Sequence, residues 1–129
     1  MEFPLSADHI FIAGGYTDMR RSIDGLSAIV SSTLSLSPFQ SSLFLFCGRR
    51  RDRFKALLWQ GDGFLLLYKR LESGRLQWPV TTRPLLEISF QQYRWLMEGL
   101  SIVQPRAVKK ISHPCLRLPV ISRQPSAKS

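Results

Sequence analysis

The chain has 129 residues, of which 44% are hydrophobic, and it carries a formal net charge of +9 at pH 7 with an isoelectric point near 10.4. This length and apolar content fit one globular domain with a buried core, whereas the excess of basic residues indicates an acidic partner. The two cysteines exclude a disulfide framework, and no apolar run approaches the roughly 18 residues that a membrane-spanning helix needs.

Basic residues are concentrated in two parts of the chain. Residues 49–75 carry eight basic and three acidic side chains, and residues 104–129 carry six basic side chains and no acidic one, whereas residues 1–48 have a net charge of −2. The last part also holds four prolines, which is typical of a weakly ordered segment. We therefore expect one domain over residues 1–103, followed by a basic, proline-rich tail over residues 104–129.

The cysteines and the N-terminus indicate the compartment. Cys47 ends an apolar run and is expected to be a buried thiol, while Cys115 lies in the predicted tail. Such sparse cysteines are typical of a reducing compartment. The N-terminus lacks a positively charged region followed by a long apolar stretch, so no secretory signal is expected. The expected location is the cytoplasm, with no membrane partner.

The first half of the chain contains two strand patterns and one helix pattern. The β-like run His9–Ala13 ends at two glycines, after which Thr17 or Asp18 is placed to cap a helix. Apolar residues then recur at helical spacing, which predicts a helix over Asp18–Leu34. Leu43–Cys47 is the next predicted strand, and its order after the first strand and helix is compatible with a parallel crossover.

A β-hairpin is predicted in the middle of the chain. Its strands, Phe54–Gln60 and Phe64–Leu71, flank the dipeptide Asp62-Gly63, which is the preferred pair for a two-residue type I′ turn. After a second turn, Leu76–Trp78 is expected to return as a short strand.

The predicted turn fixes a register for this hairpin. Trp59 is expected to face Leu66, and Lys55 to face Arg70. One face of the hairpin then carries these two cations with Trp59 and Tyr68, and the other face is almost wholly apolar. The apolar face is expected to pack on the helices.

The last predicted element is a helix over Ser89–Leu100. Ser89 and Gln92 form a capping-box pattern, and Ile88 and Tyr93 are spaced as a hydrophobic staple. Together the elements predict an α+β fold, in which a mostly antiparallel β-meander sheet has two helices packed on one face.

Cations interleaved with aromatic rings suit a polyanion that also offers bases for stacking, which favours nucleic acid. Directly opposed cations on the hairpin are unfavourable unless Asp52, Glu72 or a bound phosphate neutralises them. The alternative interpretation is a solvated loop, basic residues that protect exposed strands, and rings that belong to the core. The candidate nucleic-acid-binding residues are Arg49, Arg50, Arg51, Arg53, Lys55, Lys69, Arg70, Arg75, Trp59 and Tyr68.

Residues suited to catalysis are few. His9 and His113 lie at opposite ends of the chain, and no pair of residues has metal-ligand spacing. Asp18, Asp24 and Asp62 are the candidates for a two-metal nuclease cluster. That hypothesis is the weaker one, because Asp18 fits a helix cap and Asp62 fits a turn. We expect no catalytic residue, no metal and no cofactor.

Three blocks of the sequence resemble one family. Gly15–Leu26 resembles a TDMRxSxDGL block, and Leu43–Lys55 resembles an LFxFxxRRxDRxK block. Trp59–Pro79 resembles the block WxxDGxxLxxKRLExGRFxWP. In this order, over about residues 8–103, the chain is similar to the small TnpB-type accessory protein of the insertion-sequence-sixty-six transposon family, which is distinct from the RNA-guided nuclease of the same name.

The resemblance implies a bacterial accessory protein of DNA transposition. Members are encoded beside a separate DDE transposase, are needed for efficient transposition and have no established catalytic activity. Leu76 departs from the family pattern, which has an aromatic residue there, and the tail from Gln104 is longer than expected. Two hypotheses follow. The protein binds DNA directly, and with weak sequence specificity, through the basic hairpin, or it is a protein-interaction module that recruits or activates the transposase.

Truncation after Val103 is expected to leave the thermal midpoint of unfolding nearly unchanged. The prolines of the tail remove backbone donors, and its apolar residues show no sustained period. Scanning calorimetry of the full-length and truncated chains measures the effect. Loss of cooperative unfolding in the shortened chain would show that the tail belongs to the core.

Overall fold

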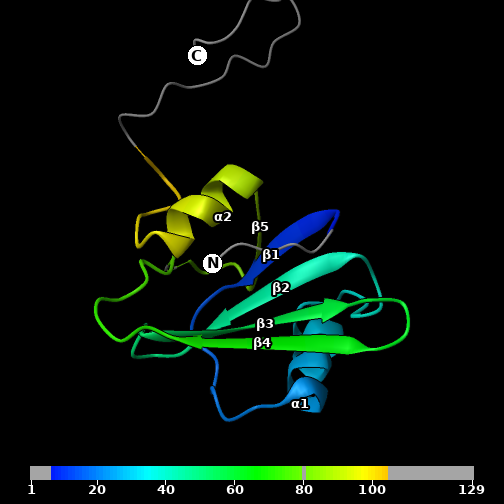
Figure 1. The fold of residues 1–129 in the computed structure, drawn as a ribbon. Coiled ribbons are helices and arrows are strands. Elements are labelled where there is room, and N and C mark those ends of the chain that lie inside the picture. The colour runs from blue at the N-terminus through cyan, green and yellow to red at the C-terminus, as the bar shows by residue number, and fades with distance from the viewer. Residues whose placement is uncertain (1–6, 80, 105–129) are drawn as a thin grey trace, which may run out of the picture.

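A computed structural model describes residues 7–79 and 81–104 of the chain (Figure 1). Most of the predicted tail, with His113 and Cys115, lies outside the described residues.

Among the described residues, five strands form one sheet in the order β4-β3-β2-β1-β5 (Figure 1). β1 and β2 run parallel, and the three other neighbouring pairs are antiparallel. The predicted α+β fold and the parallel pairing of the first two strands are therefore confirmed. The strands are His9–Ala13 (β1), Ser42–Cys47 (β2), Arg53–Trp59 (β3), Phe64–Arg70 (β4) and Leu85–Ile88 (β5).

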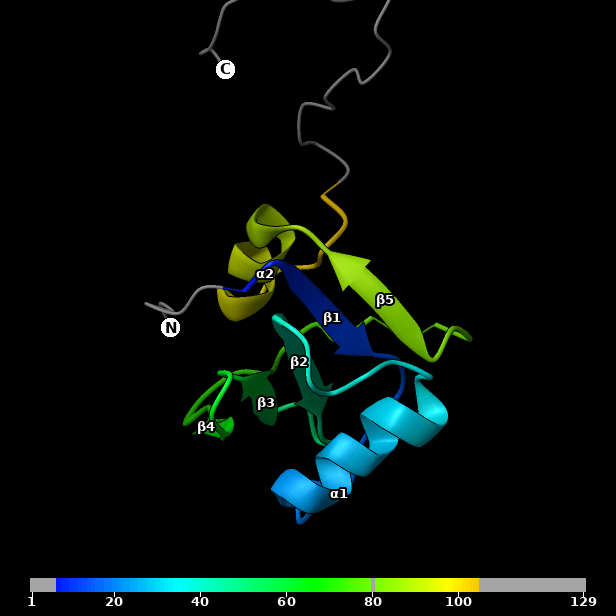
Figure 2. The ribbon, with the colours of Figure 1, turned by 90° about the vertical axis from the view of Figure 1, so that its right-hand side faces the viewer.

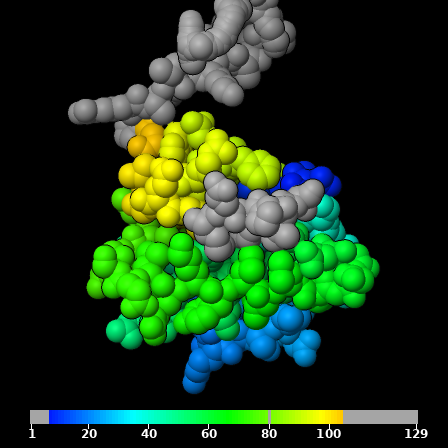
Figure 3. All heavy atoms as spheres, in the orientation of Figure 1, coloured from blue at the N-terminus to red at the C-terminus, as the bar shows by residue number. Residues whose placement is uncertain are grey.

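The helices pack on opposite faces of this sheet. α1 (Ile23–Ala28) continues into the π-helical turn η1 (Ile29–Thr33) and covers one face, whereas α2 (Phe90–Met97) covers the other (Figures 1 and 2). In the space-filling view, the two helical regions flank the band that contains β3 and β4 (Figure 3). The prediction that both helices pack on one face is wrong.

The central strands explain this arrangement, because they are apolar on both faces. All six residues of β2 are buried. Leu43 and Leu45 share a core with α2, whereas Phe44 and Phe46 share the other core with Leu26 of α1. Alternate residues of a strand point to opposite faces, so a doubly apolar strand needs a cover on each side. The prediction considered the hairpin alone, and the second strand of that hairpin lies at the edge of the sheet.

The first helix begins later than predicted. It starts at Ile23 rather than at Asp18, and its N-cap is Ser22, whose side chain accepts no capping hydrogen bond. The predicted caps are therefore wrong. The carboxylate of Asp18 instead accepts hydrogen bonds from Nε of Arg20 at 3.0 Å and from Nη2 at 2.8 Å. This pairing keeps residues 17–22 as an irregular segment on the surface.

The hairpin loop is longer than predicted. It comprises residues 60–63, and the backbone N–H of Gln60 donates to the carbonyl oxygen of Gly63 at 2.9 Å. Gly61 adopts a φ of 92°, which favours glycine. Trp59 therefore pairs with Phe64 rather than with Leu66, and their ring centroids lie 4.9 Å apart.

The corrected register changes the cation pairs. Lys55 lies opposite Tyr68, and Arg53 lies opposite Arg70, so the predicted pair of Lys55 with Arg70 is wrong. A shift of two residues leaves every side chain on its expected face, because the period of a strand is two. The composition of each face was therefore predicted correctly.

The segment after the hairpin also differs from expectation. The segment Leu76–Trp78 is not a strand, although the side chains of Leu76 and Trp78 are buried. The indole N–H of Trp78 donates to the carbonyl oxygen of Ala13 at 3.1 Å, which fixes this segment against the end of β1. β5 was not predicted, because it is short, follows Pro84 and contains the exposed Glu87.

The predicted capping box of the last helix is confirmed. The backbone N–H of Gln92 donates to Oγ of Ser89 at 3.1 Å, and the N–H of Ser89 donates to Oε1 of Gln92 at 2.8 Å. The helix ends at Met97 instead of Leu100, because the chain turns at Gly99 with a φ of 80°.

Replacing Ser89 with alanine should lower the free energy of unfolding by about 1 kcal/mol, because the first turn of α2 loses its acceptor. Chemical denaturation measures the change. S89D retains an acceptor and should remain close to the wild type, and S73A, in an exposed turn, is the matched control. Equal stability of S89A and S73A would contradict the assignment.

Candidate nucleic-acid interface

The arginine loop, defined here as residues 48–52, connects β2 to β3 and has an ordered backbone. The N–H of Arg51 donates to the carbonyl oxygen of Gly48 at 2.9 Å, and Arg51 adopts a φ of 61°. The loop is also tied to the chain after β4. Leu71 donates its N–H to the oxygen of Asp52 at 2.6 Å, and Leu76 donates to the oxygen of Arg51 at 2.7 Å.

A second segment, residues 14–19, runs beside this loop. The N–H of Thr17 donates to the carbonyl oxygen of Cys47 at 2.8 Å, which holds the segment against the end of β2. Cys47 itself is fully buried, as predicted, and burial raises the pKa of its thiol to about 12. This cysteine is therefore part of the core and offers no reactive thiolate to the site.

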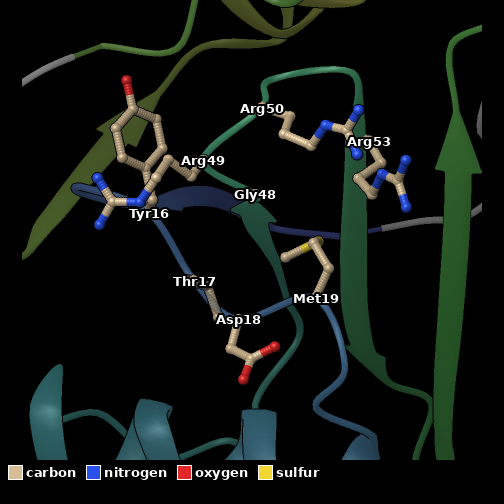
Figure 4. A pocket seen from close by; sticks show the side chains of 8 residues that line it. All are labelled: Tyr16, Thr17, Asp18, Met19, Gly48, Arg49, Arg50 and Arg53. Atoms are coloured by element: carbon tan, nitrogen blue, oxygen red, sulfur yellow. The ribbon is translucent and has the colours of Figure 1, made fainter.

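The two segments enclose a surface hollow of about 400 Å³, called here the arginine hollow (Figure 4). Arg49 and Tyr16 lie on one side of it, and Arg50 and Arg53 lie on the other (Figure 4). The guanidinium carbon of Arg49 is 5.7 Å from the centroid of the Tyr16 ring. The lining residues are Tyr16, Thr17, Asp18, Met19, Gly48, Arg49, Arg50 and Arg53.

The acidic residues of the site are paired with particular arginines. Nε of Arg53 lies 3.0 Å from Oδ1 of Asp52, and these hydrogen bonds hold the pKa of the Asp52 carboxyl below its usual value. Arg20 does the same for Asp18, so both carboxylates stay ionised. Within the described part of the chain, no carboxylate forms an ion pair with Arg49, Arg50 or Arg51.

The basic surface continues from Arg53 along the hairpin. Nζ of Lys55 donates to the carbonyl oxygen of Arg21 at 2.8 Å and lies 5.3 Å from the centroid of the Tyr68 ring. Arg70, opposite Arg53, forms an ion pair with Glu72 at 3.2 Å. The predicted neutralisation by Asp52 and Glu72 is thus present, although it acts on the pair Arg53 and Arg70.

Three of the predicted site residues lie elsewhere. Trp59 is at the far end of β3, about 20 Å from Arg53 along the strand. Its ring packs against Phe39 and Phe64 instead of joining the cations. Lys69 points to the opposite face of the sheet, and Arg75 is exposed in the loop after β4.

The contribution of residues 16–21 to this surface was not predicted from the sequence. Tyr16 is 38% exposed beside Arg49, and Arg20 and Arg21 lie in the same segment. Interpretation of Asp18 as a helix cap placed Arg20 and Arg21 inside a helix and gave Tyr16 no role. The available signal was an aromatic residue between a glycine pair and two consecutive arginines.

Neither a metal centre nor a membrane helix is found among residues 7–79 and 81–104. No three His, Cys, Asp or Glu side chains of these residues are grouped as ligands, so Asp18, Asp24 and Asp62 do not form the cluster that a two-metal nuclease needs. No helix of the same residues has the length and apolar character to cross a membrane.

Comparison with known proteins gives one family. Residues 8–107 match the family described as IS66 Orf2 like protein. Two proteins of Sinorhizobium fredii (strain NBRC 101917 / NGR234), both described as uncharacterized, are similar to the chain. The protein y4jC is 35% identical to this chain over 70% of this chain and 78% of its own length. The protein y4hO is also 35% identical, over 75% of this chain and 84% of its own length. No solved structure is significantly similar to the chain.

Gly48 supports the floor of the arginine hollow, because a Cβ atom at this position would lie 2.8 Å from Cγ of Met19. We expect G48A to lower the free energy of unfolding by about 1–3 kcal/mol through overpacking. In the double variant G48A/M19A the clash is absent. Its free energy of unfolding should therefore fall by less than the sum of the decreases in G48A and in M19A. Chemical denaturation of the four proteins measures this coupling, and strict additivity would contradict it.

Proposed function

This chain belongs to the IS66 Orf2-like family, and from that premise we propose that it assists transposition by binding DNA directly. Members of this family are accessory proteins of IS66 elements and are not generally characterised as catalytic. The proposed binding surface, called here the cationic surface, consists of Tyr16, Arg49, Arg50, Arg53, Lys55, Tyr68 and Arg70. The acidic partner is the phosphate backbone of the element, and the transposase of the same element acts beside it.

One observation carries the proposal. Arg49, Arg50 and Arg53 come from the loop and the start of β3, and they border one hollow together with the ring of Tyr16. Asp18 and Asp52, the acidic residues of this region, already pair with Arg20 and Arg53. The charges of Arg49 and Arg50 therefore remain available for an external anion.

The chemistry of this surface suits phosphate contacts more than base reading in a groove. Guanidinium groups bind phosphate oxygens in a bidentate way, and such contacts position a protein on DNA without specifying its sequence. No described helix presents its side chains toward this surface as a groove-reading element, because α1 begins only at Ile23 and packs on the sheet. We therefore propose weakly specific binding.

A second candidate function rests on the opposite end of the hairpin. Phe39 is 60% exposed, and the centroid of its ring lies 5.0 Å from that of Trp59 and 5.4 Å from that of Phe64. Exposed aromatic side chains are enriched at protein interfaces. This aromatic end favours the alternative that the protein recruits or activates the transposase, either instead of or together with DNA binding.

F39S should abolish co-purification with the transposase if this candidate is correct and leave it unchanged if it is wrong.

Replacing Arg49 and Arg50 with alanine should weaken binding to every DNA sequence and flatten the dependence of affinity on salt. Each lost phosphate contact removes about 0.9 from the slope of log affinity against log salt concentration, so the double variant should lose up to roughly 2. Arg51 is better left in place, because its left-handed backbone and its carbonyl bond to Leu76 serve the fold. Fluorescence anisotropy at several salt concentrations measures both quantities.

R83A/R94A is the matched control, since it removes two exposed charges near β5 and from α2. If both double variants lose affinity equally, only net charge matters and the arginine loop is not the site. If the wild type binds neither single- nor double-stranded DNA at low salt, direct DNA binding is wrong.

A further inference from the structure

We infer that the arginine hollow is a nucleotide pocket, which takes one unpaired nucleotide of a DNA strand. In this arrangement the base lies against Tyr16 and Met19, and the phosphate lies between Arg50 and Arg53. The inference rests on the proposed function, because it names what the arginine loop holds beyond the phosphate backbone.

The size and lining of the hollow fit a nucleotide. Its volume of about 400 Å³ is within the range of pockets that enclose small molecules, roughly 300–1,000 Å³. Its wall combines an aromatic ring, the thioether of Met19 and the guanidinium groups of three arginines. An inorganic anion would leave the apolar part of the wall uncovered, and a purely apolar ligand would leave the charges of Arg49 and Arg50 without an anion.

The arrangement of charge orients the ligand. Arg50 and Arg53 lie along the upper border of the hollow, whereas Asp18 lies at its lower border (Figure 4). The carboxylate of Asp18 is paired with Arg20, so the lower border offers a phosphate group no free cation, and the phosphate belongs at the arginine side.

Tyr16 and Arg49 together offer a stacking surface. The guanidinium group of Arg49 lies over the Tyr16 ring at 5.7 Å, and bases stack on both tyrosine rings and guanidinium planes. Tyr16 also lines a second hollow of about 290 Å³, together with Thr17 and Asp18, and is 38% exposed. A ring in this position can accept a base without displacing the packed core.

The walls are held in place before any ligand binds. The N–H of Thr17 donates a hydrogen bond to the carbonyl oxygen of Cys47. Arg53 is fixed by two hydrogen bonds that it donates to the carboxylate of Asp52, at 3.0 and 3.4 Å. Met19 packs on Gly48, where there is no room for a side chain. A preformed pocket loses little conformational entropy on binding, which favours affinity.

Only an unpaired base can enter this site. In a duplex the faces of the bases are stacked and their edges are paired, and exposing one base costs unstacking energy. The protein should therefore prefer a single strand, a frayed end or a mismatch over a fully paired duplex of the same length.

Abasic DNA separates this inference from the proposed function. We would measure the affinity of the full chain by fluorescence anisotropy for a single strand, for the same strand with tetrahydrofuran in place of several bases, and for the duplex. The abasic strand retains the phosphates but not the bases. The intact strand should bind about tenfold more tightly than the abasic strand.

Variants of Tyr16 identify the site. Y16A should bind intact and abasic strands with equal affinity and keep the salt slope of the wild type, whereas Y16F should retain the preference for bases. F90A is the matched control, because Phe90 is 54% exposed at the start of α2 on the opposite face of the sheet. F90A should also retain the preference.

Each remaining outcome is decisive. Equal affinity of the wild type for intact and abasic strands, with a steep salt slope, would overturn the nucleotide pocket and leave phosphate binding by the arginine loop in place. Persistence of the base preference in Y16A would overturn this location for the base. Absence of binding to all three DNAs would overturn the proposed function and this inference together.

Discussion

The candidate site depends on backbone hydrogen bonds at the carboxyl end of β2. The N–H groups of Thr17, Leu71 and Leu76 bind carbonyl oxygens of Cys47, Asp52 and Arg51, at 2.6–2.8 Å. These bonds bring the segment before α1 and the segment after β4 against the arginine loop. A loop without such partners would lose conformational entropy on binding and would not keep three guanidinium groups around one hollow. The hollow is therefore a property of this corner of the fold, and the run of arginines supplies its chemistry.

The doubly covered sheet decides where function can lie. α1 and α2 bury both faces of the central strands, so the accessible parts of the sheet are its edges, its strand ends and the outer half of β4. β4 is an edge strand, and its exposed Tyr68 and Arg70 extend the basic corner along the hairpin. Basic side chains on an edge strand also discourage pairing with another chain. A protective role and a binding role are thus compatible at these positions.

The sequence predicted the features that local chemistry determines. The capping box of Ser89, the burial of Cys47 and the face assignment of the hairpin followed from short-range patterns. The pairing register did not, because Asp62-Gly63 fits a two-residue turn, while contact between the rings of Trp59 and Phe64 favours a four-residue loop. The late start of α1 depends on the pairing of Asp18 with Arg20, and the position of Tyr16 depends on a bond to β2 from the neighbouring Thr17. The bond from Thr17 to Cys47 joins residues far apart in the sequence, so no local pattern signals it. The two local pairs compete with equally local alternatives, a helix cap at Asp18 and a two-residue turn at Asp62-Gly63, and the sequence alone does not decide between them.

The charged residues of the site divide into two groups with different physical roles. Arg20, Arg53 and Arg70 are each paired with a carboxylate, which fixes their direction and reduces their net charge. Arg49, Arg50 and Lys55 form no ion pair among the described residues, so their charges remain available to attract an anion. The aromatic end, formed by Phe39, Trp59 and Phe64, lies at the other end of the same hairpin. The proposed assignments place a DNA-binding end and a protein-binding end about 20 Å apart on one hairpin. Both partners can then be held at once without competing for a surface.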